Sequence, residues 1–224
     1  MTERSKRRPG ILVRGSILVL ALLAAIVLWR VNRNDTSAAR PANRFAGCIT
    51  AYHSGTDADG DGMDDQTDIL QSALHYTETH PKYKSRYYEG GYPNDGCGVC
   101  TDLVAAALKG AGFDLRDLVD QDIRQHPDRY DVKAPDPNID YRRVNNLRVW
   151  FQNNTISCTL DVQDIEGWQG GDIVIFRKHI GIISDRRNEQ GIPYVIHHNS
   201  PHQRCYEEDI LGTRKDIVGH YRIS

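Results

Sequence analysis

Cys100 is the residue of this chain best placed by its sequence neighbours to act as a nucleophile. It follows Gly98-Val99 and begins an apolar stretch that contains Leu103 and Val104, which predicts a helix starting at the cysteine. Backbone N–H groups in the first turn of a helix are unpaired, and the helix dipole favours a thiolate there. We therefore expect a lowered pKa for Cys100, although a buried structural cysteine fits this segment alone equally well.

Two histidines on neighbouring predicted strands favour the catalytic interpretation. His179 begins the apolar segment His179-Ile-Gly-Ile-Ile183, and His197 ends the segment Tyr194-Val-Ile-His197. A histidine at a strand start can face a helix N-terminus, and a polar group on the next strand can fix its tautomer. His198 should point to the opposite face of its strand, so we rank it below His197.

A run of aspartates at residues 57–68 matches the calcium loop of an EF-hand. Acids occupy loop positions one, three, five, nine and twelve, and Gly62 occupies position six, where the chain must bend sharply. The predicted calcium ligands are Asp57, Asp59, Asp61, the backbone carbonyl of Met63, Asp65 and Asp68. Position twelve is Asp instead of Glu and no helix is predicted before the loop, so we expect an isolated, weak, structural calcium site. A solvated acidic turn that caps a helix is the alternative.

The elements that must position these residues follow an α+β pattern. Apolar periodicity predicts helices over residues 69–77, 100–110, 115–123 and 142–151. Short β-branched segments predict strands over residues 172–176, 179–183, 194–197 and 217–223. Helices that precede a group of closely spaced strands are typical of helices packed on an antiparallel sheet.

The N-terminus resembles a signal anchor. Basic residues precede an apolar run from Ile17 to Trp29, and Arg30 follows at once. We therefore expect a basic flank and a single transmembrane helix over residues 1–31, a linker over 32–44 and a domain over 45–224. The protein would be anchored in the cell membrane, with the domain outside the cytoplasm. A cleaved signal peptide, or a lipoprotein modified at Cys48, is the alternative.

Bulk composition excludes some classes of protein and leaves others open. Apolar residues make up 39% and charged residues 26% of the 224 residues, a globular balance, and the net charge of −2 gives no indication of nucleic-acid binding. No motif for an organic cofactor is present. Five cysteines leave one unpaired if the others form disulfides, and the pairing of Cys48, Cys97, Cys158 and Cys205 stays open.

Taken together, these motifs resemble a known family. Gly-Val-Cys-Thr-Asp at 98–102, Lys-His-Ile-Gly-Ile at 178–182 and Val-Ile-His at 195–197 are similar to the bacterial family called domain of unknown function 1287. Their order also resembles the NlpC-type cell-wall peptidases of the papain superfamily. The resemblance implies a papain-like fold with Cys100 as nucleophile, His179 as general base and His197 as orienting residue. It also implies an amide substrate in peptidoglycan, with the Cys100 N–H and a second donor, for which we consider Tyr92, as the oxyanion hole.

Three other functions remain open on the sequence. Cys97-Gly-Val-Cys100 is a C-x-x-C motif, as in thiol–disulfide oxidoreductases, although no apolar strand precedes it. Zinc bound by cysteines and histidines is a second alternative, but the remaining ligands lack zinc-like spacing. The third is a non-catalytic, calcium-stabilised module that binds the cell wall. Lipid and small-amide substrates also stay open, because papain-like folds act on both.

Overall fold

The computed structural model describes residues 17, 19–28 and 36–223, which fall into two units, Met1–Asp35 and Thr36–Ser224. In the first unit, residues 19–28 are helical. No helix among the described residues has the length and apolar character needed to cross a membrane. The predicted membrane-spanning helix, and with it the single-pass membrane localisation, is therefore wrong on this structure. The described helical residues 19–28 extend about 15 Å, half of a bilayer core. The rest of the predicted anchor lies outside the described residues.

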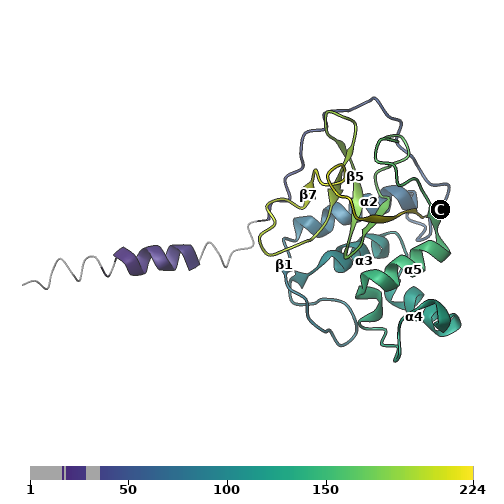
Figure 1. Ribbon diagram of the computed structural model, residues 1–224, viewed down its shortest axis with the longest axis horizontal. Coiled ribbons are helices and arrows are strands. Elements are labelled where there is room, and N and C mark those ends of the chain that lie inside the picture. The colour runs from purple at the N-terminus through teal and green to yellow at the C-terminus, as the bar shows by residue number, and fades with distance from the viewer. Residues whose placement is uncertain (1–16, 18, 29–35, 224) are drawn as a thin grey trace, which may run out of the picture. The chain divides into compact units, whose positions relative to one another are not determined.

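Four α-helices of the second unit lie where the apolar periodicity predicted them. They are α2 (Asp65–Glu78), α3 (Cys100–Gly110), α4 (Leu115–Gln125) and α5 (Val144–Asn154), with short 3₁₀ turns η1 (Pro127–Arg129) and η2 (Asp140–Arg142) between them. Asp64 and Asp114 cap α2 and α4 by accepting hydrogen bonds from backbone N–H groups of the first turn. Figure 1 shows these helices beside the sheet.

The sheet contains six strands in the spatial order β3-β8-β4-β5-β6-β7, and every pairing is antiparallel. The strands are β3 (Ile156–Ser157), β4 (Ile173–Phe176), β5 (His179–Arg187), β6 (Pro193–Ile196), β7 (Glu207–Glu208) and β8 (Ile217–Arg222). Two further short strands, β1 (Lys82–Tyr83) and β2 (Cys97–Gly98), pair in parallel just before α3. The α+β class predicted from the sequence is confirmed.

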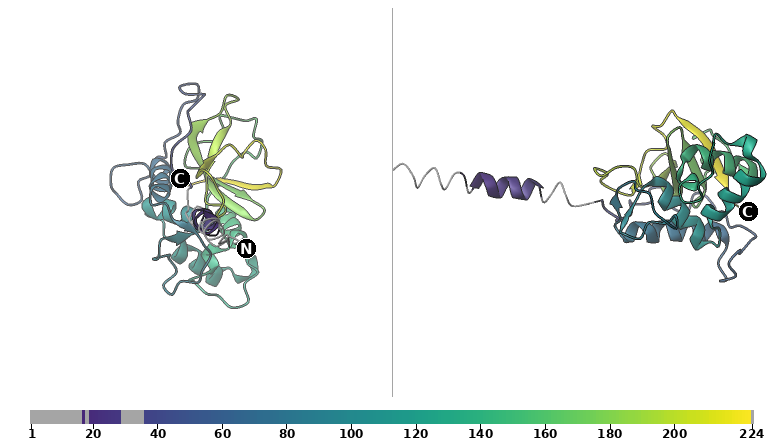
Figure 2. Two further views of the ribbon diagram at one scale, coloured as in Figure 1. Left: turned by 90° about the vertical axis from the view of Figure 1, so that its left-hand side faces the viewer. Right: turned by 90° about the horizontal axis from the view of Figure 1, so that it is seen from below.

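Both faces of the central strands are buried, which explains why β4 and the Ile180–Ile183 part of β5 contain apolar residues and one glycine. Ile175 and its partner Ile180 pack into the core shared with α2 and α3, whereas Val174 and Phe176 pack with Trp168 on the other face. Burying each such side chain contributes about 1.5–3 kcal/mol. In the left view of Figure 2, the green and yellow strands lie to one side of the blue and teal helices.

The compact unit begins at Thr36 and so includes much of the segment that we expected to be a linker, instead of beginning at residue 45. The buried Thr36 hydroxyl donates to the carbonyl of Gln203, and Ser37 forms a β-bridge with Cys205. Arg40 donates to both carboxylate oxygens of Glu207 on β7. These contacts attach residues 36–40 to the edge of the sheet that carries β7.

Candidate active site

The N-terminus of α3 is held by a buried ion pair two residues beyond Cys100. Asp102 accepts a hydrogen bond from the backbone N–H of Val99, at 2.9 Å, as a side chain in the first turn of a helix can do. The same carboxylate receives two hydrogen bonds from Arg142 of η2, at 2.7 and 2.9 Å. Arg142 also donates to the carbonyl of Arg86. Asp102 thus joins the turn that presents Cys100 to a second element forty residues away.

Cys100 is the first residue of α3, and its sulfur lies at the start of β5. The backbone N–H groups of Ile180, which follows His179, and of Thr101 act to lower the pKa of the thiol, so both lie close to the sulfur. Partial burial nevertheless raises the pKa of the Cys100 thiol to about 11, and the charge of Asp102 acts in the same direction. The expected lowering of this pKa is therefore wrong: the helix N–H groups do favour the thiolate, but the loss of solvent outweighs them.

His179 and His197 form a hydrogen-bonded chain that ends on a carboxylate. His179 Nε2 lies 2.8 Å from His197 Nδ1, and His197 Nε2 lies 3.0 Å from Glu208 Oε2. The chain runs across three neighbouring strands, from the first residue of β5, past the end of β6, to β7. Both imidazole side chains are buried.

The carboxylate fixes the tautomer of each ring. Ionised Glu208 can only accept, so His197 carries its proton on Nε2 and its Nδ1 accepts from His179 Nε2–H. This assignment follows from the network and leaves Nδ1 of His179 unprotonated. Among the described residues, no hydrogen bond is made to that nitrogen.

Electrostatics keep His179 in the form that accepts a proton. Burial, together with positive charge on His197 and Arg214, lowers the pKa of His179 to about 3. The ring is also stacked on Phe176, with centroids 5.9 Å apart. His179 is therefore a neutral imidazole at ordinary pH, and Cys100 beside the same strand start is a neutral thiol.

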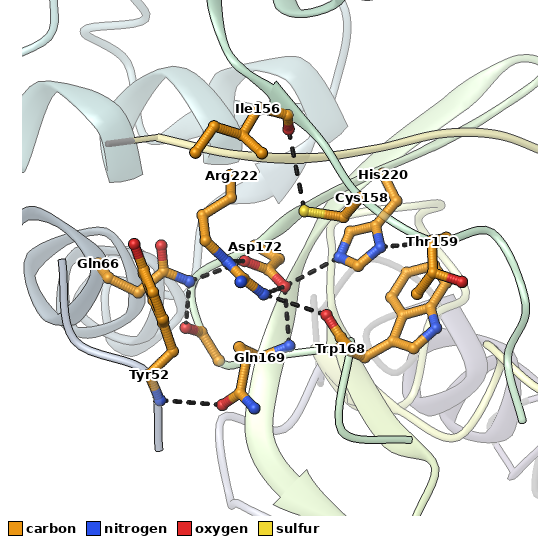
Figure 3. A network of polar contacts seen from close by, with 12 residues as sticks. Tyr52, Gln66, Ile156, Cys158, Thr159, Trp168, Gln169, Asp172, His220 and Arg222 are labelled. Carbon is orange, nitrogen blue, oxygen red and sulfur yellow. Dashed lines mark hydrogen bonds and ion pairs between the residues drawn. The ribbon is translucent and has the colours of Figure 1, made fainter. Parts of the chain in front are cut away.

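His220 shows by contrast what a structural histidine looks like in this fold. Both of its ring nitrogens are engaged, Nδ1 with the carbonyl of Thr159 at 2.7 Å and Nε2 with Asp172 at 2.9 Å, and Trp168 is stacked on the ring. Asp172 is fully buried and also accepts hydrogen bonds from the side chains of Arg222 and Gln66 (Figure 3). A histidine with no free nitrogen cannot take a proton from a substrate, so this network holds the sheet together.

Tyr76 and Tyr83 lie near the cysteine, and both contact His198. The Tyr76 hydroxyl lies 3.1 Å from His198 Nδ1, and the Tyr83 ring packs edge-on against His198, with centroids 5.2 Å apart. The charge of a Cys100 thiolate would raise the pKa of both tyrosines, which places both near the sulfur. A side chain at position 98 would overlap the Tyr76 hydroxyl, so Gly98 is needed for this approach.

The cysteines form no disulfide, and Tyr92 has another hydrogen-bond partner. All five cysteines are free thiols, including Cys97, which is buried on β2. The Tyr92 hydroxyl, considered as an oxyanion donor, donates instead to Asp114 at the start of α4.

The acidic loop leads directly into α2. Asp57, Asp59 and Asp61 each offer a carboxylate oxygen within 4.8 Å of the others, and all three are exposed. The Asp65 carboxylate has other partners: it accepts hydrogen bonds from the Thr56 hydroxyl at 2.6 Å and from the Ala58 N–H at 2.7 Å. Within residues 36–64 no helix precedes the loop, as expected.

The sequence did not point to Glu208 or to the role of Asp102. Glu208 lies on a strand of only two residues, beyond an irregular segment, so no periodicity marks it. No sequence pattern indicated the ion pair of Asp102, because its partner Arg142 is distant in the sequence.

Comparison with known proteins agrees with the motifs. Residues 70–223 match the family described as domain of unknown function (DUF1287). The chain belongs to this family. It is also 37% identical over 151 residues to the uncharacterized protein YijF of Escherichia coli K-12, a match that covers 63% of this chain and 72% of YijF. No solved structure matches the chain.

Proposed function

We propose that this DUF1287 protein is a cysteine hydrolase that cleaves an amide bond by acyl transfer, with a papain-like arrangement of a nucleophile helix on an antiparallel sheet. The observation that carries the proposal is the chain Glu208–His197–His179. It leaves one unprotonated imidazole nitrogen at the strand start, close to the Cys100 sulfur. Cys100 is then the nucleophile, His179 the general base, and His197 and Glu208 are positioning residues.

The reaction begins from a neutral pair. His179 Nδ1 accepts the thiol proton as the sulfur attacks the amide carbonyl carbon, and the same proton passes to the departing amine when the C–N bond breaks. Water then attacks the thioester, gives its proton to His179, and releases a carboxylic acid and the thiol. The pKa of His179, lowered to about 3, keeps the base unprotonated before each cycle.

The negative oxygen formed during attack needs hydrogen-bond donors. The Cys100 backbone N–H is one candidate, because it lies in the first turn of α3. The Tyr83 hydroxyl is the second in this proposal, in place of Tyr92, because it lies near Cys100 and makes no hydrogen bond among the described residues. Tyr83→Phe should then lower kcat about 10²-fold or more without raising KM, as removal of an oxyanion donor does elsewhere.

A basic groove supports a substrate that carries free carboxylates, such as a peptidoglycan peptide. A hollow of about 700 Å³ is lined by five cations and a single carboxylate: Arg129, Arg143, Arg148, Arg177, Lys178 and Asp131. Arg177 and Lys178 form the two-residue turn that joins β4 to His179. Neither side chain forms an ion pair with a described residue, so both are available to an anionic peptide.

The decisive test is hydrolysis of purified peptidoglycan peptides, followed by mass spectrometry of the products. We expect the wild-type protein to release cleaved peptides, and Cys100→Ala and His179→Ala to release none. We also expect an acyl group to be trapped on Cys100. Glu208→Gln should lower kcat with little change in KM and an unchanged melting temperature. Equal rates in wild type and Cys100→Ala would refute the hydrolase. A wild-type protein that binds peptidoglycan without cleaving it would favour a binding module.

The groove is tested separately with the double variant Arg177→Ala/Lys178→Ala. It should raise KM for a peptide with free carboxylates about 10-fold or more, while KM for the same peptide in amidated form changes little. Arg44→Ala, which removes an exposed arginine outside the groove, is the matched control. An equal effect on both peptides would contradict carboxylate recognition.

A further inference from the structure

One buried carboxylate in the first turn of α2 has no partner. Asp68 is only 6% exposed, and its Oδ2 atom is buried without a hydrogen bond. Neither side-chain oxygen of Asp68 forms an ion pair or hydrogen bond with any described residue. A buried charge without a partner is costly, so its presence requires an explanation.

The surroundings of Asp68 make the cost larger. The charged neighbours that act on it most strongly are carboxylates, those of Asp61, Asp59, Asp57 and Asp65, and their like charge repels it. Three of them, Asp57, Asp59 and Asp61, already bring oxygen atoms within 4.8 Å of one another at the surface. A cation would remove this repulsion and give the orphan carboxylate a partner.

The loop backbone is already wound around these side chains. Asp57 accepts hydrogen bonds from the N–H groups of Gly60 and Gly62, at 2.7 and 3.0 Å, and Asp61 accepts from Met63 at 2.8 Å. Gly62 has a φ of 97°, which an L side chain rarely adopts, so this position must be glycine for the loop to turn. Asp57, Asp59 and Asp61 are therefore arranged before any cation binds, whereas Asp68 lies outside the group of oxygens within 4.8 Å and has to approach them to join the site.

We propose that Asp57, Asp59, Asp61 and Asp68 form a calcium site. Four carboxylates, supplemented by water and the Met63 carbonyl, supply the six to eight hard oxygens that calcium prefers. Asp65, the ninth residue of the loop, is not a ligand in this arrangement, because Thr56 and Ala58 occupy both of its oxygens and it braces the loop instead. The inference does not depend on the hydrolase chemistry.

The site would link the loop to the helices behind Cys100. Asp68 belongs to α2, which packs along α3, and a Cβ at Gly112, just after α3, would lie 3.2 Å from Asp59. Calcium bound here would therefore fasten the loop across the α2–α3 pair. The dissociation constant expected for such an isolated site is roughly 10⁻⁴ to 10⁻³ M.

The test is calorimetric titration of calcium chloride into the EDTA-treated protein, together with thermal unfolding with and without calcium. We expect one site in the wild type, and an affinity at least about 10-fold lower in Asp59→Asn and Asp61→Asn. Asp68→Asn gives the sharpest result, because removing the repelled charge should raise the melting temperature without calcium while abolishing most of the calcium-induced rise. A raised melting temperature also shows that this variant folds.

Asp128→Asn is the matched control, since it removes an exposed carboxylate from η1 and should change neither quantity. The proposal is overturned if the wild type shows no binding heat and no thermal shift at about 10 mM calcium, well above the expected dissociation constant. It is equally overturned if Asp68→Asn binds calcium as tightly as the wild type.

Discussion

Replacing Arg142 with alanine should destabilise the protein strongly, although this residue is far from Cys100 in the sequence. Arg142 and Asp102 are each about 2% exposed at the side chain and make two hydrogen bonds to each other. Arg142→Ala leaves the Asp102 carboxylate buried with a single backbone N–H, from Val99, as its donor. Removing one partner of a buried ion pair typically costs about 3–5 kcal/mol.

The same change should be visible as a lower melting temperature. For a unit of this size, each kcal/mol corresponds to about 2–4 °C, so the expected decrease is roughly 6–20 °C. Urea unfolding followed by circular dichroism measures the free energy directly. The m-value should stay constant, because the variant exposes the same surface on unfolding.

Arg143→Ala is the matched control, because the neighbouring residue is 53% exposed at the side chain and lies 3.7 Å from Asp140. Such an exposed pair contributes at most about 1 kcal/mol. The double variant Asp102→Asn/Arg142→Met should be less destabilised than Arg142→Ala, since it leaves no uncompensated charge. A loss in Arg142→Ala no larger than in Arg143→Ala would refute the reasoning.

Two further changes test the chemistry and the helix packing. The rate of Cys100 alkylation by iodoacetamide should rise about tenfold per pH unit from pH 7 to 9.5. The reason is that the thiol has a pKa of about 11 and only its thiolate reacts. A rate that stays constant near neutral pH would instead indicate a thiolate paired with protonated His179. Gly110→Ala should lower the free energy of unfolding by about 1–3 kcal/mol, because a Cβ there would overlap the Ser72 hydroxyl on α2. Gly55→Ala, which has open space around it, should change the stability little, and an equal loss in both glycine variants would contradict the packing argument.

The elements of the fold could be predicted from the sequence because they depend on local patterns. Apolar periodicity located α2 to α5, and runs of β-branched residues located β4, β5, β6 and β8. The order of strands in the sheet could not be read in this way. Pairing of β8 between β3 and β4 depends on which faces are buried in three dimensions, not on any short segment.

The candidate site was predicted only in part, for a related reason. Cys100, His179 and His197 stand beside glycines and apolar runs that mark their positions in a helix or a strand. Glu208 completes the histidine chain from a two-residue strand, and Arg142 binds Asp102 from a 3₁₀ turn. Both elements are too short to show a periodic pattern of apolar residues. Side chains that act across non-local contacts are therefore the ones that the sequence left out.

The direction of the Cys100 pKa shows how tertiary burial can reverse a local argument. Position in the first turn of α3 predicts a stabilised thiolate, and the N–H groups of Thr101 and Ile180 do act in that direction. The helix and the sheet that supply these donors also remove water from the sulfur, and this second effect is the larger one. With a pKa of about 11, only about one thiol in ten thousand is ionised at pH 7. In the proposed mechanism, a nucleophile in this state needs a base that is already deprotonated and oriented, and the chain from Glu208 through His197 would supply it at His179. The same arrangement protects the resting thiol from alkylation and oxidation, because reactivity towards such reagents follows the thiolate.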